Sequence, residues 1–135
     1  MNYEDQLIEW TIRYVKHRDL MKKNLIDYKI LKNHIDFEFK DKKHIYFIYE
    51  DLKDNVLEEI GKDFITFVVL NKNTNLNFLV KNWNQFLKNQ NLNLVFVHPS
   101  SNQSWTVNPF FHNKIAEPKK LKSGLLSLFD GIKAV

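Results

Sequence analysis

Two strongly apolar segments, separated by one amphipathic segment, constrain the fold of this chain more than any other feature. The segments FITFVVL (64–70) and LNLVFVH (92–98) are apolar on both faces, with Thr66 as an interruption, which is typical of central strands covered by helices on both sides. Between them, residues 75–89 place six apolar side chains within one helical arc of about 120°: Leu76, Leu79, Val80, Trp83, Phe86 and Leu87. This order predicts a βαβ unit with parallel strands and a right-handed crossover.

The residues before this unit predict a helix and an antiparallel hairpin. Apolar side chains recur at helical spacing near the N-terminus, and we expect an amphipathic helix from about Tyr3 to about Lys22. The segment HIDFEFK (34–40) alternates apolar and charged side chains, and HIYFIYE (44–50) follows it after the polar turn DKK. We therefore expect these two segments to pair as a hairpin. The segment IDYKIL (26–31) is compatible with one further strand.

The loops on either side of the first apolar strand carry residues that favour helix boundaries. Residues 51–60 have apolar side chains at helical spacing, and Gly61 follows them. This pattern predicts a short helix that is ended by a glycine in the left-handed conformation. Asn73 or Thr74 is expected to cap the helix over 75–89, because Asn and Thr oxygens accept hydrogen bonds from free N–H groups at a helix start.

The C-terminal third completes the predicted architecture. SWTV (104–107) predicts a further strand, Asn108-Pro109 favours a turn within a loop, and Pro118 begins a last helix. We therefore expect a single α/β domain over residues 1–135. It contains a mixed sheet of five or six strands, with an antiparallel hairpin, one parallel βαβ unit and flanking helices.

Composition excludes several classes of protein. The chain has no cysteine, which excludes disulfides, zinc–thiolate sites and thiol nucleophiles. Its histidines form no i, i+4 pair, and its three glycines form no phosphate-binding loop. No segment approaches the about 20 apolar residues of a membrane-spanning helix, and the N-terminus MNYEDQLIEW lacks the basic region of a signal peptide. We expect a cytoplasmic protein with no cofactor and no membrane contact.

Charge is distributed unevenly along the chain. Residues 1–63 hold 12 Lys/Arg and 14 Asp/Glu, whereas residues 64–135 hold 8 Lys and 2 acids, a net charge of +6. A half of one sign creates a field that attracts phosphate polymers and other anionic partners, so DNA or RNA is the first expected partner. In the alternative interpretation the asymmetry reflects biased composition, since twelve Asn residues lie between positions 64 and 116.

Contacts with nucleic acid are expected from the basic and aromatic side chains of this half. Lysines pair with phosphates, and aromatic rings stack on bases. We assign this role to Lys72, Phe78, Lys81, Lys88, Trp105, His112, Lys114, Lys119, Lys120 and Lys122. In the alternative interpretation, Trp105, Phe110 and Phe111 close the core and the lysines are ordinary solvated side chains. An exposed Phe78 would then indicate a protein partner or self-association.

The order of predicted elements over residues 3–98 resembles the restriction-endonuclease-like core of the acid-x-Lys nucleases. The resemblance implies an acid at the end of the second hairpin strand and an acid-x-Lys motif on the next strand, which together hold Mg²⁺ or Mn²⁺. Glu50 and Asp51 stand at the first place. At the second place, Leu70-Asn71-Lys72 supplies the lysine but has leucine instead of the acid, so the implied metal site is incomplete.

A literal acid-x-Lys motif also occurs at Glu38-Phe39-Lys40, with Asp27 upstream. The strand that carries Glu38 leads into a hairpin rather than into the βαβ helix, and the same pattern occurs at four other places in the chain. We therefore predict a non-catalytic binding or accessory domain, with nucleic acid as the first candidate partner. The alternatives are a metal-dependent nuclease that uses Asp27, Glu38 and Lys40, or Glu50 and Asp51, and a protein-interaction subunit.

Overall fold

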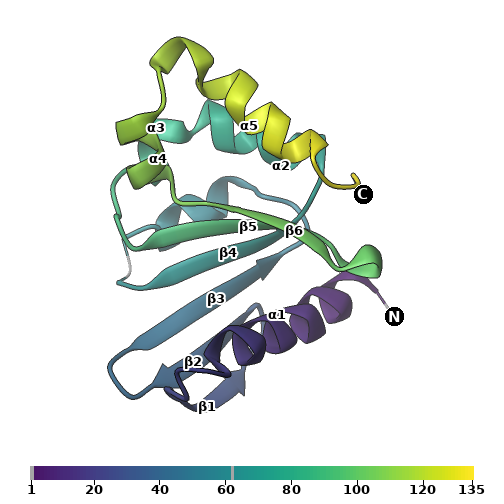
Figure 1. Ribbon diagram of the computed structural model, residues 1–135, viewed down its shortest axis with the longest axis vertical. Helices are drawn as coiled ribbons and strands as arrows, with labels where there is room; N and C mark the ends of the chain where they lie inside the picture. Colours follow the sequence, from purple (N-terminus) through teal and green to yellow (C-terminus); the bar gives the residue numbers. More distant parts are fainter. Residues whose placement is uncertain (1, 62) are drawn as a thin grey trace.

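The computed structural model of the protein describes residues 2–61 and 63–135 (Figure 1). Six strands form one sheet in the order of the sequence, β1-β2-β3-β4-β5-β6. The strands are β1 (Leu25–Ile30), β2 (His34–Phe39), β3 (Lys43–Tyr49), β4 (Ile65–Leu70), β5 (Leu92–His98) and β6 (Gln103–Val107). The α-helices are α1 (Tyr3–Asp19), α2 (Asn73–Lys81), α3 (Trp83–Phe86), α4 (Pro109–Ile115) and α5 (Leu121–Asp130). Three short 3₁₀ helices are η1 (Asp54–Glu59), η2 (Pro99–Ser101) and η3 (Pro118–Lys120).

The sheet is mixed, which confirms the predicted fold class. The β2–β3 hairpin is antiparallel and β4 pairs with β5 in parallel, as the sequence patterns predict. In addition, β3 pairs with β4 in parallel, while β1 and β6 add antiparallel strands at the two edges. Three adjacent strands, β3, β4 and β5, therefore run in the same direction, and their amino ends lie side by side.

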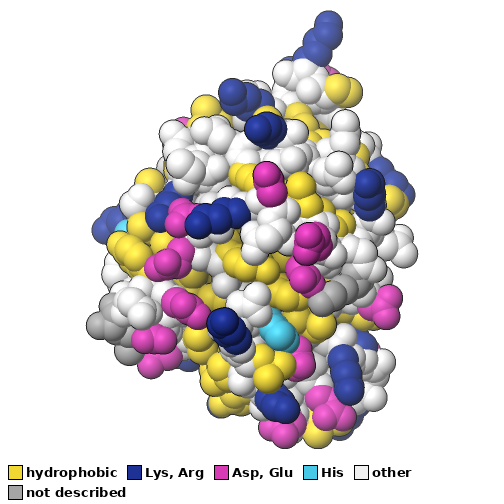
Figure 2. Space-filling view, turned by 180° about the vertical axis from the view of Figure 1, so that it is seen from behind, with side chains coloured by type: hydrophobic (Ala, Val, Ile, Leu, Met, Phe, Trp, Pro, Cys, Tyr) yellow, Lys and Arg dark blue, Asp and Glu magenta, His cyan; other side chains and the backbone are white. Residues whose placement is uncertain are grey.

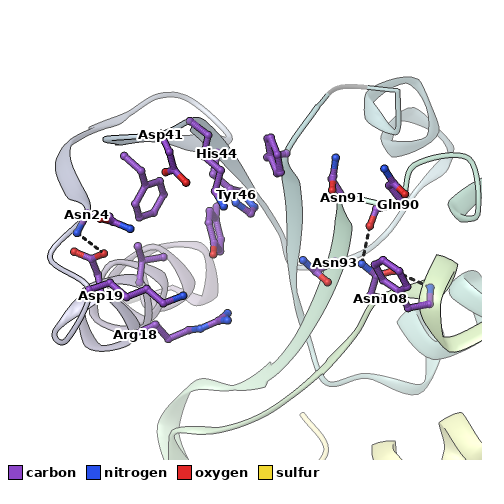
Figure 3. A pocket seen from close by; sticks show the side chains of 16 residues that line it. Arg18, Asp19, Asn24, Asp41, His44, Tyr46, Gln90, Asn91, Asn93 and Asn108 are labelled. Atoms are coloured by element: carbon purple, nitrogen blue, oxygen red, sulfur yellow. Dashed lines mark hydrogen bonds between the residues drawn. The ribbon is translucent and has the colours of Figure 1, made fainter.

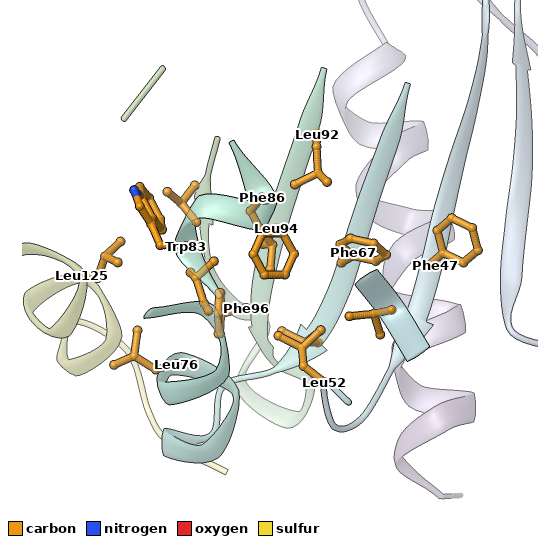
Figure 4. Close-up of a cluster of buried hydrophobic side chains, with 14 of the residues drawn as sticks. Phe47, Leu52, Phe67, Leu76, Trp83, Phe86, Leu92, Leu94, Phe96 and Leu125 are labelled. Atoms are coloured by element: carbon orange, nitrogen blue, oxygen red, sulfur yellow. The ribbon is translucent and has the colours of Figure 1, made fainter. Parts of the chain in front are cut away.

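Helices cover both faces of the sheet, so the core has two layers. On one face α1 packs against β3 and β4 and buries a cluster around Leu7, Phe37 and Val68. On the other face, α2, α3, α5 and η1 cover a larger cluster (Figure 4). Every residue of β4 is buried. This double coverage explains why the two central strands are apolar on both faces.

The first helix ends three residues earlier than the sequence pattern predicts, at Asp19 instead of Lys22. The Asp19 carboxylate accepts hydrogen bonds from the backbone N–H groups of Asn24 (3.0 Å) and Leu25 (2.9 Å). Lys23 adopts the left-handed conformation, with φ 52°. These contacts reverse the chain and direct it into β1, so the last predicted helical turn does not form.

The prediction of an α-helix ended by Gly61 is wrong in two respects. The helical turn over residues 54–59 is a 3₁₀ helix, and no described glycine has a positive φ. The backbone N–H of Leu52 donates to the side chain of Asn75 (2.7 Å), which holds the chain after β3 outside a helix. The helical turn therefore begins at Asp54 and not at Asp51.

The predicted helix over 75–89 is divided in the structure. It begins at Asn73, so neither Asn73 nor Thr74 caps it, and Lys72 stands at the N-cap position without a side-chain hydrogen bond. The helix breaks at Asn82, whose side chain donates to the carbonyl of Phe78 (3.0 Å). Such local bonds from Asn compete with helix continuation. The predicted core face is confirmed, with four of its residues buried: Leu76, Leu79, Trp83 and Phe86.

The loop predicted around Asn108-Pro109 is the helix α4. Asn108 caps this helix by accepting a hydrogen bond from the N–H of Phe111 (3.1 Å), and Pro109 occupies the first helical position. Asn108-Pro109, for which the sequence predicts a turn, therefore begins a helix. Pro118 begins η3 and is followed by α5. No helix among the described residues is both long and apolar enough to cross a membrane.

Candidate functional site

A pocket opens at the amino ends of β3, β4 and β5, on the face of the sheet that α1 covers (Figure 3). The last turn of α1 forms one wall, the turn between β2 and β3 forms another, and the start of α4 lies at the rim. The cavity has a volume of about 380 Å³. This volume lies within the usual range for small-molecule sites.

The floor of the pocket is a polar row across three strands. Tyr46, Thr66 and Asn93 are register partners on β3, β4 and β5. Because side chains alternate along a strand, His44 lies two residues before Tyr46 on the same face, and Phe64 lies two residues before Thr66. The same sheet face is apolar further along the strands, at Ile48, Val68 and Val95. The polar row therefore begins where the cover of α1 ends.

A buried hydroxyl links two titratable side chains of this floor. The Thr66 hydroxyl lies 2.8 Å from Nε2 of His44 and also forms a hydrogen bond with Tyr46. Burial, together with the nearby charges of Lys42 and Arg18, lowers the pKa of His44 to about 4. Burial raises the pKa of Tyr46 to about 12. Both side chains are therefore uncharged at neutral pH, and the floor carries no compensating charge.

Two cations border this neutral floor, and neither has a carboxylate partner among the described residues. Nη1 of Arg18, in the last turn of α1, donates to the Tyr14 hydroxyl (3.0 Å). Nζ of Lys42, in the β2–β3 turn, lies 4.9 Å from the centre of the Phe64 ring. Both cations act on His44, since each lowers its pKa. The two cations thus create a positive potential at the floor of the pocket.

The two carboxylates at the pocket reduce this positive potential but do not outnumber the cations. Both oxygens of Asp19 are engaged by the backbone N–H groups that end α1. Asp41 is exposed at the rim, and Lys22 adds a third cation there. The lining residues therefore have more positive than negative groups, in a concave site where low-dielectric walls strengthen the field.

The wall formed by β5 and the residues before it carries free amides. The side chains of Gln90, Asn91 and Asn93 form no hydrogen bond with another described residue, although all three line the pocket. Figure 3 shows Asn91 and Asn93 across the pocket from His44 and Tyr46. By contrast, Asn108 is engaged, since it caps α4 and donates to the carbonyl of Gln90 (2.9 Å).

The residues predicted to contact nucleic acid fall into three groups. Trp105 is buried, and its Nε1 donates to Asn71 (2.8 Å), so it closes the core as the alternative interpretation predicts. Phe78 is half-buried and packs on Phe86, with ring centres 6.4 Å apart. Lys72 pairs with Asp51 at 3.0 Å. These three side chains are engaged inside the protein.

A second group lies next to the pocket on α4. The Phe111 side chain is 52 % exposed and lines the pocket. Nζ of Lys114 lies 4.4 Å from the centre of the Phe110 ring and 5.8 Å from that of Phe111. His112 packs edge-on against Trp83. Lysine and aromatic side chains of α4 therefore continue the polar surface beyond the pocket.

The remaining lysines are exposed and distributed over other elements. Lys88 bonds to Gln85 (2.8 Å) and Lys120 pairs with Glu117 (3.6 Å). The others are Lys81 on α2, Lys119 on η3 and Lys122 on α5. Figure 2 shows basic side chains at the end of the molecule formed by α5 and the segment before it, and both basic and acidic side chains scattered over the rest of that face.

The acidic residues of the nuclease alternative lie at two separate places. Asp27 and Glu38 are register partners on β1 and β2, next to the start of β3. Glu50 and Asp51 follow the opposite end of β3, and Lys40 is exposed after β2. Among the described residues, no three His, Asp or Glu side chains are grouped so that they could hold a metal ion. Leu70, at the place of the missing acid, is fully buried.

Sequence reasoning did not identify Arg18, Lys42, His44 or Asn93 as site residues. One signal was present, because Thr66 and Asn93 are the polar interruptions near the starts of the two apolar strands. In parallel strands, polar residues at equivalent positions meet on one face of the sheet. The contributions of α1 and of the β2–β3 turn depend on tertiary packing and carry no sequence signature.

No protein-family model, curated protein sequence or solved structure matches this chain.

Proposed function

We propose that the protein is a non-catalytic nucleic-acid-binding domain, and that DNA or RNA binds across the pocket at the amino ends of β3, β4 and β5. The observation that carries this proposal is the pair of cations at the pocket, Arg18 and Lys42. Neither forms an ion pair within the described residues. Cations held beside a neutral, concave floor favour an anionic ligand.

The surroundings of the pocket favour a polynucleotide over a simple anion. Phe111 and Lys114 on α4 extend the site by an exposed ring and a further positive charge. Alternation of rings and cations is the pattern by which proteins hold single-stranded nucleic acid, because rings stack on bases while cations track phosphates. The amides of Gln90, Asn91 and Asn93, which no described residue engages, add donors and acceptors without charge.

Fluorescence anisotropy of end-labelled single- and double-stranded DNA and RNA, measured across a salt series, tests this proposal. Phosphate contacts release counterions, so log K should fall linearly with log salt, by about 0.7 per contact on a single strand. We expect Arg18→Gln and Lys42→Gln each to weaken binding and to reduce the slope by about that amount. Lys53→Gln removes the same charge from an exposed position near the other end of the strands and serves as the control.

Two outcomes would overturn the proposal. The absence of salt-dependent binding to any of these oligonucleotides would remove nucleic acid as the partner and direct attention to protein ligands. Cleavage that requires Mg²⁺ or Mn²⁺, seen on gels of the same samples, would contradict the non-catalytic assignment. Variants of Asp27, Glu38, Lys40, Glu50 and Asp51 would then distinguish the two nuclease alternatives.

A further inference from the structure

We propose that the pocket holds one nucleoside monophosphate unit, the phosphorylated terminal nucleotide of a single strand, with the phosphate at Arg18 and Lys42 and the base against the amides of Gln90, Asn91 and Asn93. This inference rests on the proposed function and specifies its ligand. It is carried by the division of the pocket into a cationic side and an amide side (Figure 3).

The cationic side matches a terminal phosphate. A phosphodiester inside a strand carries one negative charge, whereas a phosphomonoester at a strand end carries nearly two at neutral pH. Arg18 offers N–H groups beyond the one that donates to Tyr14, and the Lys42 ammonium has no carboxylate partner among the described residues. The charge of a dianion therefore matches these two cations better than the single charge of an internal phosphate does.

The amide side suits a base. Gln90, Asn91 and Asn93 each offer an acceptor oxygen and a donor NH₂ group, and no described residue engages them. Asn and Gln amides form paired hydrogen bonds with base edges, because both partners present a donor next to an acceptor. The exposed Phe111 ring at the rim provides a surface for stacking.

The size of the cavity limits what can enter. A volume of about 380 Å³ accommodates a ligand of mononucleotide size. A base within a duplex would have to enter together with its paired base, which a cavity of mononucleotide size does not accommodate, so the amides can meet only an unpaired base. The pocket should therefore select single-stranded ends over blunt duplex ends.

Competition binding tests the inference with the full chain. A labelled six-nucleotide strand with a 5′-hydroxyl is compared with the same strand bearing a 5′-phosphate or a 3′-phosphate. We expect a terminal phosphate to strengthen binding by about tenfold, in line with one charge-assisted contact. This gain should disappear in the Arg18→Gln Lys42→Gln double variant and persist in Lys53→Gln.

Small competitors distinguish the possible sources of the phosphate. Nucleoside monophosphates should displace the phosphorylated strand at lower concentration than ribose 5-phosphate, inorganic phosphate or the parent nucleosides. In the Asn91→Ala Asn93→Ala variant, the advantage of a nucleoside monophosphate over ribose 5-phosphate should be lost. Circular dichroism and the thermal midpoint confirm that each variant is folded.

The failure of this inference differs from that of the proposed function. If strands bind equally well with and without a terminal phosphate, the inference is overturned while nucleic-acid binding stands. If inorganic phosphate competes as well as the mononucleotides, the pocket is a plain anion site and the base contacts are wrong. If no strand binds at all, both proposals fail.

Discussion

Asn side chains lie at both ends of the parallel strands β3, β4 and β5. Their amides are hydrogen-bonded at the carboxyl end, whereas some of those at the amino end have no hydrogen-bond partner among the described residues. At the carboxyl end, the Asn75 amide accepts a hydrogen bond from Leu52 N–H (2.7 Å) and donates to the carbonyls of Glu50 (2.8 Å) and Leu70 (2.9 Å). At the amino end, the amides of Asn91 and Asn93 have no partner among the described residues. An Asn amide therefore stabilises the fold where backbone groups form hydrogen bonds with it, and is available to a ligand where they do not.

A second amide closes the carboxyl end more completely. Asn71 accepts from Nε1 of Trp105 (2.8 Å) and donates to the carbonyls of Phe129 (3.3 Å) and Lys133 (3.0 Å). Open α/β sheets usually bind ligands beyond the carboxyl ends of their strands. In this protein that end is filled by its own chain, and the available polar groups lie at the opposite end.

The largest expected effect tests the structural role of Asn75. Asn75→Ala leaves the N–H of Leu52 and the carbonyl of Glu50 without their partner at a site that is 1 % exposed, whereas the Leu70 carbonyl keeps its hydrogen bond from the N–H of Lys72 (2.8 Å). Each buried group left unpaired costs about 1–3 kcal/mol, so we expect a loss of about 3 kcal/mol or more in urea denaturation. Asn77→Ala, at an exposed position of the same helix, should change stability by less than about 0.5 kcal/mol. Equal losses of stability in Asn75→Ala and Asn77→Ala would contradict the structural role of Asn75.

The next effect concerns pH at the amino end. The pKa of His44 is about 4 in the folded protein and about 6.5 in the unfolded chain, so the unfolded state binds more protons between these values. The stabilising contribution is therefore present above pH 6.5 and is lost as the pH falls toward 4. We expect a decrease of about 2 kcal/mol in unfolding free energy between pH 7 and pH 5.

His44→Gln provides the reference for this measurement, since glutamine keeps a polar group but does not titrate. The difference between the pH profiles of the two proteins isolates His44 from the other histidines. A bound phosphate should reduce the effect of Arg18 and Lys42 on the imidazole and so raise the pKa of His44. The other charged groups at the pocket are Asp19 and Lys22 at the end of α1 and Asp41 in the β2–β3 turn, with Tyr46 beside the imidazole. Identical profiles of the two proteins would show that His44 is not the source of the pH dependence.

A smaller effect is expected for the cation at the carboxyl end. Lys72 forms a partly exposed ion pair with Asp51, and pairs of this kind contribute about 0.2–1 kcal/mol. Lys72→Gln should therefore lower stability slightly in urea denaturation, with a smaller loss at high salt. Arg18→Gln, which breaks no ion pair, should show no such salt dependence of stability. A salt-independent loss in Lys72→Gln would mean that the lysine acts through packing.

The smallest effect is expected where an amide has no partner. Asn93→Ala removes no hydrogen bond between described residues, so its unfolding free energy should stay within about 0.5 kcal/mol of the original. Asn75→Ala and Asn93→Ala each remove one amide, at opposite ends of the strands, so their unfolding free energies can be compared directly. A large loss of stability in Asn93→Ala would show that the amino end is also held by its amides and is not available for a ligand.

The strands were predictable from the sequence, whereas the site was only partly so. The segments that form β4, β5 and β2 are recognisable from their own residues, because burial on both faces requires a continuous apolar run and burial on one face requires alternation. Local competition misled the prediction elsewhere, since Asn82 breaks a helix from within and Asn108 starts one where a turn was expected. The pocket depends on which residues meet across elements. Arg18 and Lys42 are 24 positions apart in the sequence and line the same pocket only as a result of tertiary packing.

The order of strands in the sheet has a kinetic consequence. Every strand pairs with its neighbours in the sequence, so the entropy cost of closing loops is low at each step, and such topologies fold faster than those with distant pairings. Strands leaving the ribosome can join a growing sheet in turn, from β1 to β6. The Asn71 amide must wait for the carbonyls of Phe129 and Lys133, which are synthesised after all six strands. During synthesis, the amino end of the strands is therefore assembled before the carboxyl end is sealed.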